Sequence, residues 1–200
     1  MTTELEAVNQ MLSVIGQVPV QEISDDVRSD SRIALGVLRE YTDELQAEGY
    51  DFNTFEGFEA EPSSVTKQIT FSQSVRRVSN YYPYPRLTLR GNRLYNLDTQ
   101  SYEHEGTQKV NIIQHLGFED LPFQLKRYVV IRASRVFANR TVGAGEINAY
   151  SREDELRARI AWLDSYSDDM QLNVLSTQKG HRPRTSRPID AIVRNGYGYN

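Results

Sequence analysis

The spacing of apolar residues changes twice along this chain of 200 residues. Up to residue 49, and again from residue 121, apolar side chains recur every three or four positions, which predicts amphipathic helices. Between these segments, short runs rich in β-branched and aromatic residues are separated by turn residues, which is typical of strands. The sequence therefore predicts an α+β fold, in which a bundle of about four helices carries a small antiparallel β insert between its second and third long helices.

These changes divide the chain into four predicted parts. They are N-terminal bundle helices in residues 1–49, the β insert in residues 50–118, C-terminal bundle helices in residues 119–172, and an extended basic arm in residues 173–200. The arm is rich in arginine, proline and glycine and has too little apolar content to fold alone.

The first two helices have clear apolar faces. In residues 3–15 that face consists of Leu5, Val8, Leu12 and Ile15. Thr3 and Glu6 have the spacing of a capping box, and Gly16 suits the end of the helix. In the second helix, predicted from Val27 to Glu48, the apolar face consists of Val27, Ile33, Ala34, Leu35, Leu38, Tyr41 and Leu45. We expect the charged residues of that helix to face solvent.

Helical spacing returns after the insert. In residues 121–140 the apolar residues that share a face are Leu125, Val129, Ala133, Val136 and Phe137. A last helix is predicted from Ile147 to Met170. Its expected buried line is Tyr150, Leu156, Ile160 and Leu163, with Trp162 at the border.

The insert contains one strong hairpin signal. Arg90, Gly91 and Asn92 separate the runs LTL and RLYNL, and glycine accepts the positive φ that a tight hairpin turn requires. The two prolines of the run YYPYP at 81–85 lack the N–H that a central strand needs. That run is therefore expected at an edge or in a loop.

The segment QAEGYDFNTFEGF, at the end of the second helix, is predicted to join the bundle to the insert. The residues proposed for this joint are Leu45, Gly49, Tyr50, Phe52 and Phe55. Gly49 would release the helix through a left-handed conformation, and the aromatic side chains would anchor the first strand.

Composition limits the possible classes of function. The chain has no cysteine, which excludes disulfides and thiolate metal sites and fits a reducing compartment. No apolar stretch is long enough for a membrane span, and the first residues lack the features of a secretory signal. Residues 1–62 carry 3 basic and 14 acidic side chains, whereas residues 121–150 carry 5 and 1. This polarity favours head-to-tail contact between copies or contact with a charged partner.

Catalytic and cofactor motifs are sparse. His104, His115 and His181 are far apart and lack the spacing of a metal site, and the chain has neither a nucleophile elbow nor a nucleotide-binding glycine loop. We therefore expect no metal, no cofactor and no catalytic residue. The one enzymatic alternative is a carboxylate pair, Glu56 and Glu59, beside aromatic residues, as glycoside hydrolysis would need.

Three interpretations of the basic arm are open: a protein-docking segment, a nucleic-acid contact, or only a disordered end. Its candidate contact residues, for a neighbouring subunit or another protein, are Arg182, Arg184, Arg187, Ile192, Arg194, Tyr197 and Tyr199. Arginine mixed with aromatic residues also suits nucleic acid, but the acidic pI of about 5.5 favours protein docking.

The order of several segments resembles the tail tubular protein A family of short-tailed bacteriophages. The segments that carry the resemblance are LEAVNQMLSVIGQVPV, EGYDFNTFEGF, RGNRLYNLDT, VNII and FEDLPFQLKRYVVIRASRVFANR, within residues 4–175. The chain departs from the family at Tyr50, where tryptophan is frequent.

This resemblance implies a structural protein of the virion tail, assembled in the host cytoplasm. It implies a homo-oligomeric ring of twelve copies that joins the portal protein to the tail nozzle protein and carries tail fibres. The ring would surround the DNA path in its lumen and help to gate the DNA during ejection. The family's functional residues are contact surfaces, so the resemblance supplies no catalytic set. The alternative that it leaves open is a tail enzyme that degrades cell-wall or capsule glycans.

Overall fold

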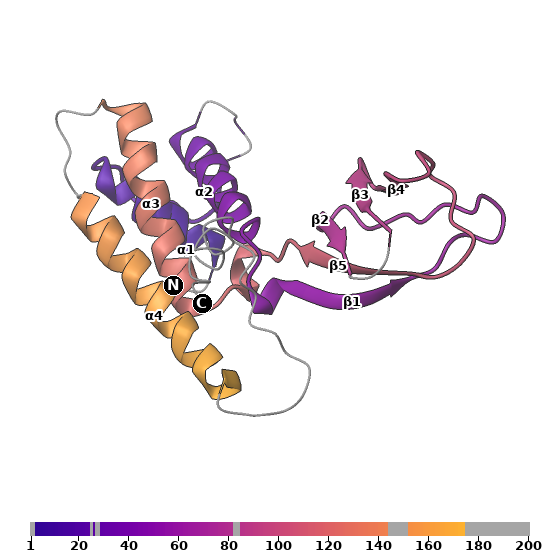
Figure 1. Ribbon diagram of the computed structural model, residues 1–200. Helices are drawn as coiled ribbons and strands as arrows, with labels where there is room; N and C mark the ends of the chain where they lie inside the picture. Colours follow the sequence, from indigo (N-terminus) through magenta and orange to yellow (C-terminus); the bar gives the residue numbers. More distant parts are fainter. Residues whose placement is uncertain (1–2, 25, 27–28, 82–84, 144–151, 175–200) are drawn as a thin grey trace. The chain divides into compact units, whose positions relative to one another are not determined.

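The computed structural model describes residues 3–24, 26, 29–81, 85–143 and 152–174 (Figure 1). The chain forms two compact units, Met1–Arg159 and Ile160–Asn200. The first unit contains three complete helices, the strands and the start of a fourth helix. The second contains the rest of that helix. Helices and antiparallel strands together confirm the predicted α+β class.

The helices of the first unit build an apolar core. Helix α1 spans Glu4–Val14, α2 spans Asp30–Gln46 and α3 spans Phe123–Thr141, and each of the three packs on the other two. Fully buried side chains from all three helices meet there, among them Val8, Met11, Leu12, Leu38, Leu125, Val129 and Phe137. Burial of such side chains contributes about 1.5–3 kcal/mol each, so this core is the main stabilising contact between these helices.

The ends of α1 follow from local sequence. The Glu6 N–H donates to Thr3 Oγ1 at 3.2 Å, which provides one half of the predicted capping box. At the other end, Gly16 has φ +75°, and the Gln17 N–H donates to the Leu12 carbonyl at 3.0 Å. This is a Schellman ending, which needs a residue that tolerates positive φ.

The insert contains two small sheets. In the first, β1 (Thr54–Ala60) and β2 (Val75–Asn80) lie antiparallel on either side of β5 (Gln108–Gln114). The second is the hairpin of β3 (Leu87–Arg90) and β4 (Arg93–Asn96). Gly91 in its turn has φ +63°, which confirms the hairpin prediction.

One apolar cluster holds the insert together. It comprises Ala60, Ile69, Phe71, Val78, Leu87, Leu94, Val110 and Ile112, from both sheets and from the segment before β2. Ile69 lies in that segment, where Gln68 and Thr70 each form a single β-bridge rather than part of a continuous strand. The insert thus has a core separate from that of the helices. Residues 82–84 of the YYPYP run lie outside the described residues.

The predicted buried line of the last helix is wrong. Helix α4 spans Arg152–Val174, and in it Leu156 is 54% exposed and Ile160 is 48% exposed, whereas Trp162 is 2% exposed. Ala158 and Trp162, four residues apart, are buried instead. Both pairs have helical spacing, so periodicity alone does not decide between them. Tyr150 lies outside the described residues.

The second helix is also shorter than predicted. It begins at Asp30 because Ser29 Oγ accepts the Arg32 N–H at 3.3 Å as an N-cap. Ile33, expected on the apolar face, is 40% exposed. It follows Arg32 in the first turn of α2, where fewer side chains are buried than further along the helix. Val27 lies outside the described residues.

Gly49 allows a direct test of the helix ending. It has φ +79°, and a Cβ added there would lie 2.6 Å from Ile113 Cδ1 of β5. Gly49→Ala should lower the free energy of unfolding by about 1–2 kcal/mol, mainly through the left-handed conformation. Urea unfolding followed by circular dichroism measures the change.

Gly36→Ala is the matched control, since Gly36 lies inside α2 with nothing within 4 Å of an added Cβ. It should stabilise the protein by about 0.5–1 kcal/mol. Equal stability of the two variants would contradict the special role of Gly49.

Candidate functional site

The end of α2 is bound to the insert through a buried side-chain amide. Gln46, 1% exposed, donates from Nε2 to the Leu116 carbonyl at 2.9 Å and accepts the Leu116 N–H at Oε1 at 2.8 Å. Leu116 lies two residues beyond the end of β5. The side chain of Gln46 therefore satisfies both backbone groups of one residue and fixes the last turn of α2 against the end of β5.

Asn53 completes this polar network. It is fully buried, donates from Nδ2 to the Gln46 carbonyl at 2.9 Å, and accepts the Tyr50 N–H at Oδ1 at 2.8 Å. The last carbonyls of a helix lack partners within the helix, so Asn53 satisfies one of them from outside. Gln46 and Asn53 are residues of the joint that the aromatic pattern did not reveal.

The predicted joint residues have different environments. Leu45 and Tyr50 are buried, and the Tyr50 hydroxyl donates to Glu48 Oε2 at 2.9 Å. The Phe52 ring stacks on that of Tyr50, with centroids 5.6 Å apart. Phe55 of β1, however, is 47% exposed and is therefore not a buried anchor.

Asp43 adds a charged contact to the joint. One carboxylate oxygen lies 2.7 Å from His115 Nδ1, and the other lies 3.3 Å from an Arg76 nitrogen of β2. In the tautomer that donates from Nδ1 to Asp43, His115 does not accept from Gln46, whose amide donates to Leu116 instead. The joint thus combines buried neutral hydrogen bonds with a partly exposed charged edge.

Acidic and basic segments of the chain meet within one molecule. Arg39 binds Glu4 through two hydrogen bonds, Arg140 binds Glu40 in the same way, and Arg132 binds Glu44 at 2.8 Å. Some of the acidic residues that were expected to contact another copy therefore pair with arginines of the same chain. Each such exposed pair contributes at most about 1 kcal/mol, but together they orient α1, α2 and α3.

The Glu40 pair has a defined dependence on pH. The hydrogen bonds from Arg140 lower the pKa of the Glu40 carboxyl. A lowered pKa in the folded state stabilises the fold above the ordinary pKa of glutamate, and this contribution is lost as the pH falls. Because both side chains are half-exposed, the contribution is small.

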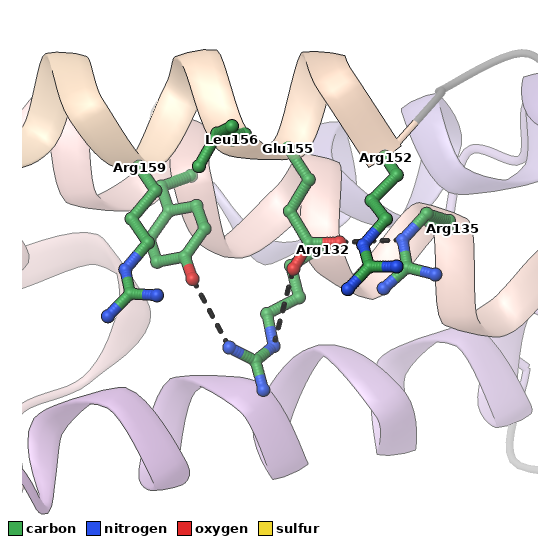
Figure 2. Close-up of a pocket in the computed structure, with 7 residues that line it drawn as sticks. Arg132, Arg135, Arg152, Glu155, Leu156 and Arg159 are labelled. Carbon is green, nitrogen blue, oxygen red and sulfur yellow. Dashed lines mark hydrogen bonds and ion pairs between the residues drawn. The ribbon is translucent and has the colours of Figure 1, made fainter.

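Four arginines surround a hollow between α3 and the start of α4, as Figure 2 shows. We call it the arginine pocket, and its volume is about 260 Å³. Its lining residues are Tyr128, Arg132, Arg135, Arg152, Glu155, Leu156 and Arg159. Arg135 binds Glu155 at 2.6 Å, and Arg132 donates to the Tyr128 hydroxyl at 3.2 Å. Periodicity pointed to α4 only as a core helix and did not indicate this cluster.

Arg132 stays charged in this setting. Burial by itself would lower the pKa of its guanidinium, but the hydrogen bond and charge of Tyr128, together with Glu44 and Glu155, outweigh burial and raise that pKa. Its guanidinium also lies over the Tyr41 ring, 4.9 Å from the centroid. Arg132 therefore gives the pocket a permanent positive charge, and contacts with Tyr41 and Glu44 of α2 and with Tyr128 of α3 hold its guanidinium in place.

The carboxylates considered for glycan hydrolysis, Glu56 and Glu59, lie on the same strand of the insert. Glu56 and Glu59 are exposed on β1, and Glu59 binds Lys109 of β5 at 2.8 Å. A groove of about 490 Å³ on the insert is lined by Glu59 and Glu61, and Glu56 is not among its lining residues. Glu56 lies within the register shift between Phe55 and Phe58, whereas Glu59 lies beyond it, opposite Lys109.

The remaining candidates from the sequence are the three histidines and the contact residues of the arm. His104 is buried in the insert, with Nε2 3.3 Å from the Leu94 carbonyl, and His115 belongs to the joint. Within the described ranges, no three histidine or acidic side chains gather as a metal site would require. His181 and the seven contact residues of the arm lie outside the described residues. Of the helices that are described, none is both long and apolar enough to cross a membrane.

Comparison with known proteins identifies one family. A family model described as tail tubular protein matches residues 5–172, which include the helices of the bundle, the joint and the whole β insert. No curated protein shows significant similarity to the chain.

Gln46→Leu tests the joint. The substitution keeps the size of the side chain but leaves the Leu116 N–H and carbonyl without their partner, at about 1–3 kcal/mol for each unsatisfied buried group. We expect a lower free energy of unfolding in urea. We also expect faster amide hydrogen exchange at Leu116.

Gln73→Leu, at an exposed position of the insert, is the control and should leave both measurements unchanged. If Gln46→Leu matched this control, the amide pairing would not hold the joint.

Proposed function

The chain belongs to the tail tubular protein family, and we propose that it forms an adaptor ring between the portal and the tail nozzle of a short-tailed bacteriophage. Membership makes it a structural component of a phage tail, which implies assembly with other tail subunits. The match to residues 5–172 carries the proposal because it includes both the helices and the insert.

The internal contacts suit a part that transmits load between two larger assemblies. The helical core, the Gln46–Leu116 pairing and the Glu40–Arg140 pair connect segments far apart in sequence. A subunit with these contacts resists separation of the insert from the helices. An adaptor needs such rigidity because portal and nozzle contact different parts of its surface.

The finer features of the proposal come from the family resemblance. We propose a ring of twelve copies, attached to tail fibres, with DNA passing through the lumen and assembly in the host cytoplasm. The basic arm of residues 173–200 is proposed to contact a neighbouring subunit or the portal, through Arg182, Arg184, Arg187 and Arg194 with Ile192, Tyr197 and Tyr199.

A structural role accounts for the carboxylates better than glycan hydrolysis does. Hydrolysis needs two carboxyl groups on opposite sides of one sugar bond. Here Glu59 is engaged with Lys109, and Glu56 does not line the groove that Glu59 shares with Glu61. Cross-strand pairing and exposure explain both residues without a reaction.

Electron microscopy of the purified chain mixed with its portal protein tests the ring. We expect closed rings of this chain, coaxial with the portal, because symmetric closure buries every copy of a repeated interface. The chain alone and the portal alone serve as controls. A chain that stays monomeric by light scattering when portal is present would contradict the proposal.

Deletion of residues 176–200 tests the arm. The shortened chain should keep its helical circular dichroism, because the core helices and the insert lie outside the deletion, but should bind the portal or its own neighbours more weakly. A second, full-length variant has Arg182, Arg184, Arg187 and Arg194 changed to Gln. It distinguishes the effect of the arm's positive charge from the effect of its presence. Unchanged assembly of both variants would contradict a role of the arm in contacts with a neighbouring subunit or the portal.

A further inference from the structure

The arginine pocket has more positive charge than its own carboxylates balance. Glu155 lies 2.6 Å from Arg135 and 4.0 Å from Arg132, and Glu44 binds Arg132 from α2. Arg152 and Arg159 form no ion pair or hydrogen bond with another residue in the described part of the chain. Two carboxylates thus face four guanidinium groups, which are charged at every physiological pH.

The sequence of α4 produces this concentration of charge. Arg152, Leu156 and Arg159 follow one another at intervals of four and three residues, so they share the helix face that borders the pocket (Figure 2). Like charges so close repel one another unless an anion lies between them. Leu156 is 54% exposed beside them and offers an apolar surface next to the charges.

The ligand class follows from these groups. A guanidinium fork binds a carboxylate or a phosphate through two parallel hydrogen bonds, and the Tyr128 hydroxyl adds a further polar group. A hollow of about 260 Å³ accepts one acidic side chain with its neighbouring atoms rather than a long polymer.

The surroundings favour a protein carboxylate over nucleic acid. Glu153 and Asp154 are in the first turn of α4 beside the pocket. A DNA duplex carries a charge about every 1.7 Å along its axis, so its backbone would also meet these acidic groups. A single side chain would not, and it could place aliphatic atoms on Leu156.

A second copy of the same chain has the complementary charge. Residues 1–62 carry 14 acidic and 3 basic side chains. Arginines of the same chain bind Glu4, Glu40, Asp43 and Glu44 from this segment. Other carboxylates remain exposed, such as Glu22 in the connection between α1 and α2.

We propose that the arginine pocket is an intersubunit site that receives a carboxylate from the acidic N-terminal region of a neighbouring copy. This inference rests on the proposed ring, because it assigns one contact between adjacent subunits. It places the pocket on a ring interface and gives that interface a strong dependence on salt, since screening weakens contacts between charges.

Site-specific crosslinking tests the occupant. The chain has no cysteine, so Leu156→Cys provides a single attachment point for a benzophenone maleimide at the edge of the pocket. Rings assembled on the portal are then irradiated, and the adducts are mapped by peptide mass spectrometry. We expect a dimer of this chain, crosslinked to a peptide from residues 1–62.

A pair of matched variants tests the charges. Arg152→Gln with Arg159→Gln should weaken ring assembly by at least about tenfold, as loss of a charged interface contact commonly does. It should also flatten the dependence of assembly on salt and abolish the adduct. Arg127→Gln with Arg157→Gln removes two exposed arginines that do not line the pocket and should change none of these.

Three results would overturn this inference but not the proposed ring. In the crosslinking experiment, they are rings that form no adduct between two copies of the chain, or an adduct to DNA or to another protein instead. In the variant experiment, it is normal assembly of the chain with Arg152→Gln and Arg159→Gln. Absence of rings in the unsubstituted protein with portal is a different failure, because it contradicts the proposed function itself.

Discussion

The pairing of the Gln46 side chain with the backbone of Leu116 holds the first unit in one arrangement. The helices and the insert each have an apolar core. Apolar contact alone would permit several orientations because it has no direction. Two hydrogen bonds from a buried amide have direction, and both must be satisfied together, so they select one orientation.

Asn53 and Gly49 support this pairing from the connection between α2 and β1. Asn53 binds the carbonyl of Gln46 itself, and the left-handed conformation of Gly49 turns the chain so that Asn53 reaches it. The joint is therefore a closed set of hydrogen bonds within a short segment. In the adaptor role that we propose, such a set would pass force on the insert directly to the end of α2.

Charge has two uses in this molecule. The long arginines of α3 reach acidic residues on α2 that lie 88 to 100 positions away in the chain, and so orient helices that the core has already brought together. Arginines at the start of α4 are not balanced in this way. In the ring that we propose, a carboxylate from a neighbouring copy would neutralise these arginines, which would lower the free energy of the assembled ring and not that of the isolated subunit.

The sequence by itself determined the elements and several of their ends. Helical and strand periodicity distinguish the two kinds of segment, and Thr3, Gly16, Gly49 and Gly91 act through local backbone geometry that needs no distant partner. The order of recognisable segments also predicted the family, which the match to residues 5–172 confirms.

Only the tertiary structure decided which partner each side chain meets. Trp162 is buried and Leu156 is exposed although both fit helical spacing, because burial depends on what lies opposite the helix. Gln46 and Asn53 look like ordinary polar residues until Leu116 and the end of α2 are brought beside them. The arginine pocket likewise exists only because α3 and α4 place their charges together, since electrostatic and hydrogen-bonding partners are set by distance in space and not by position in the chain.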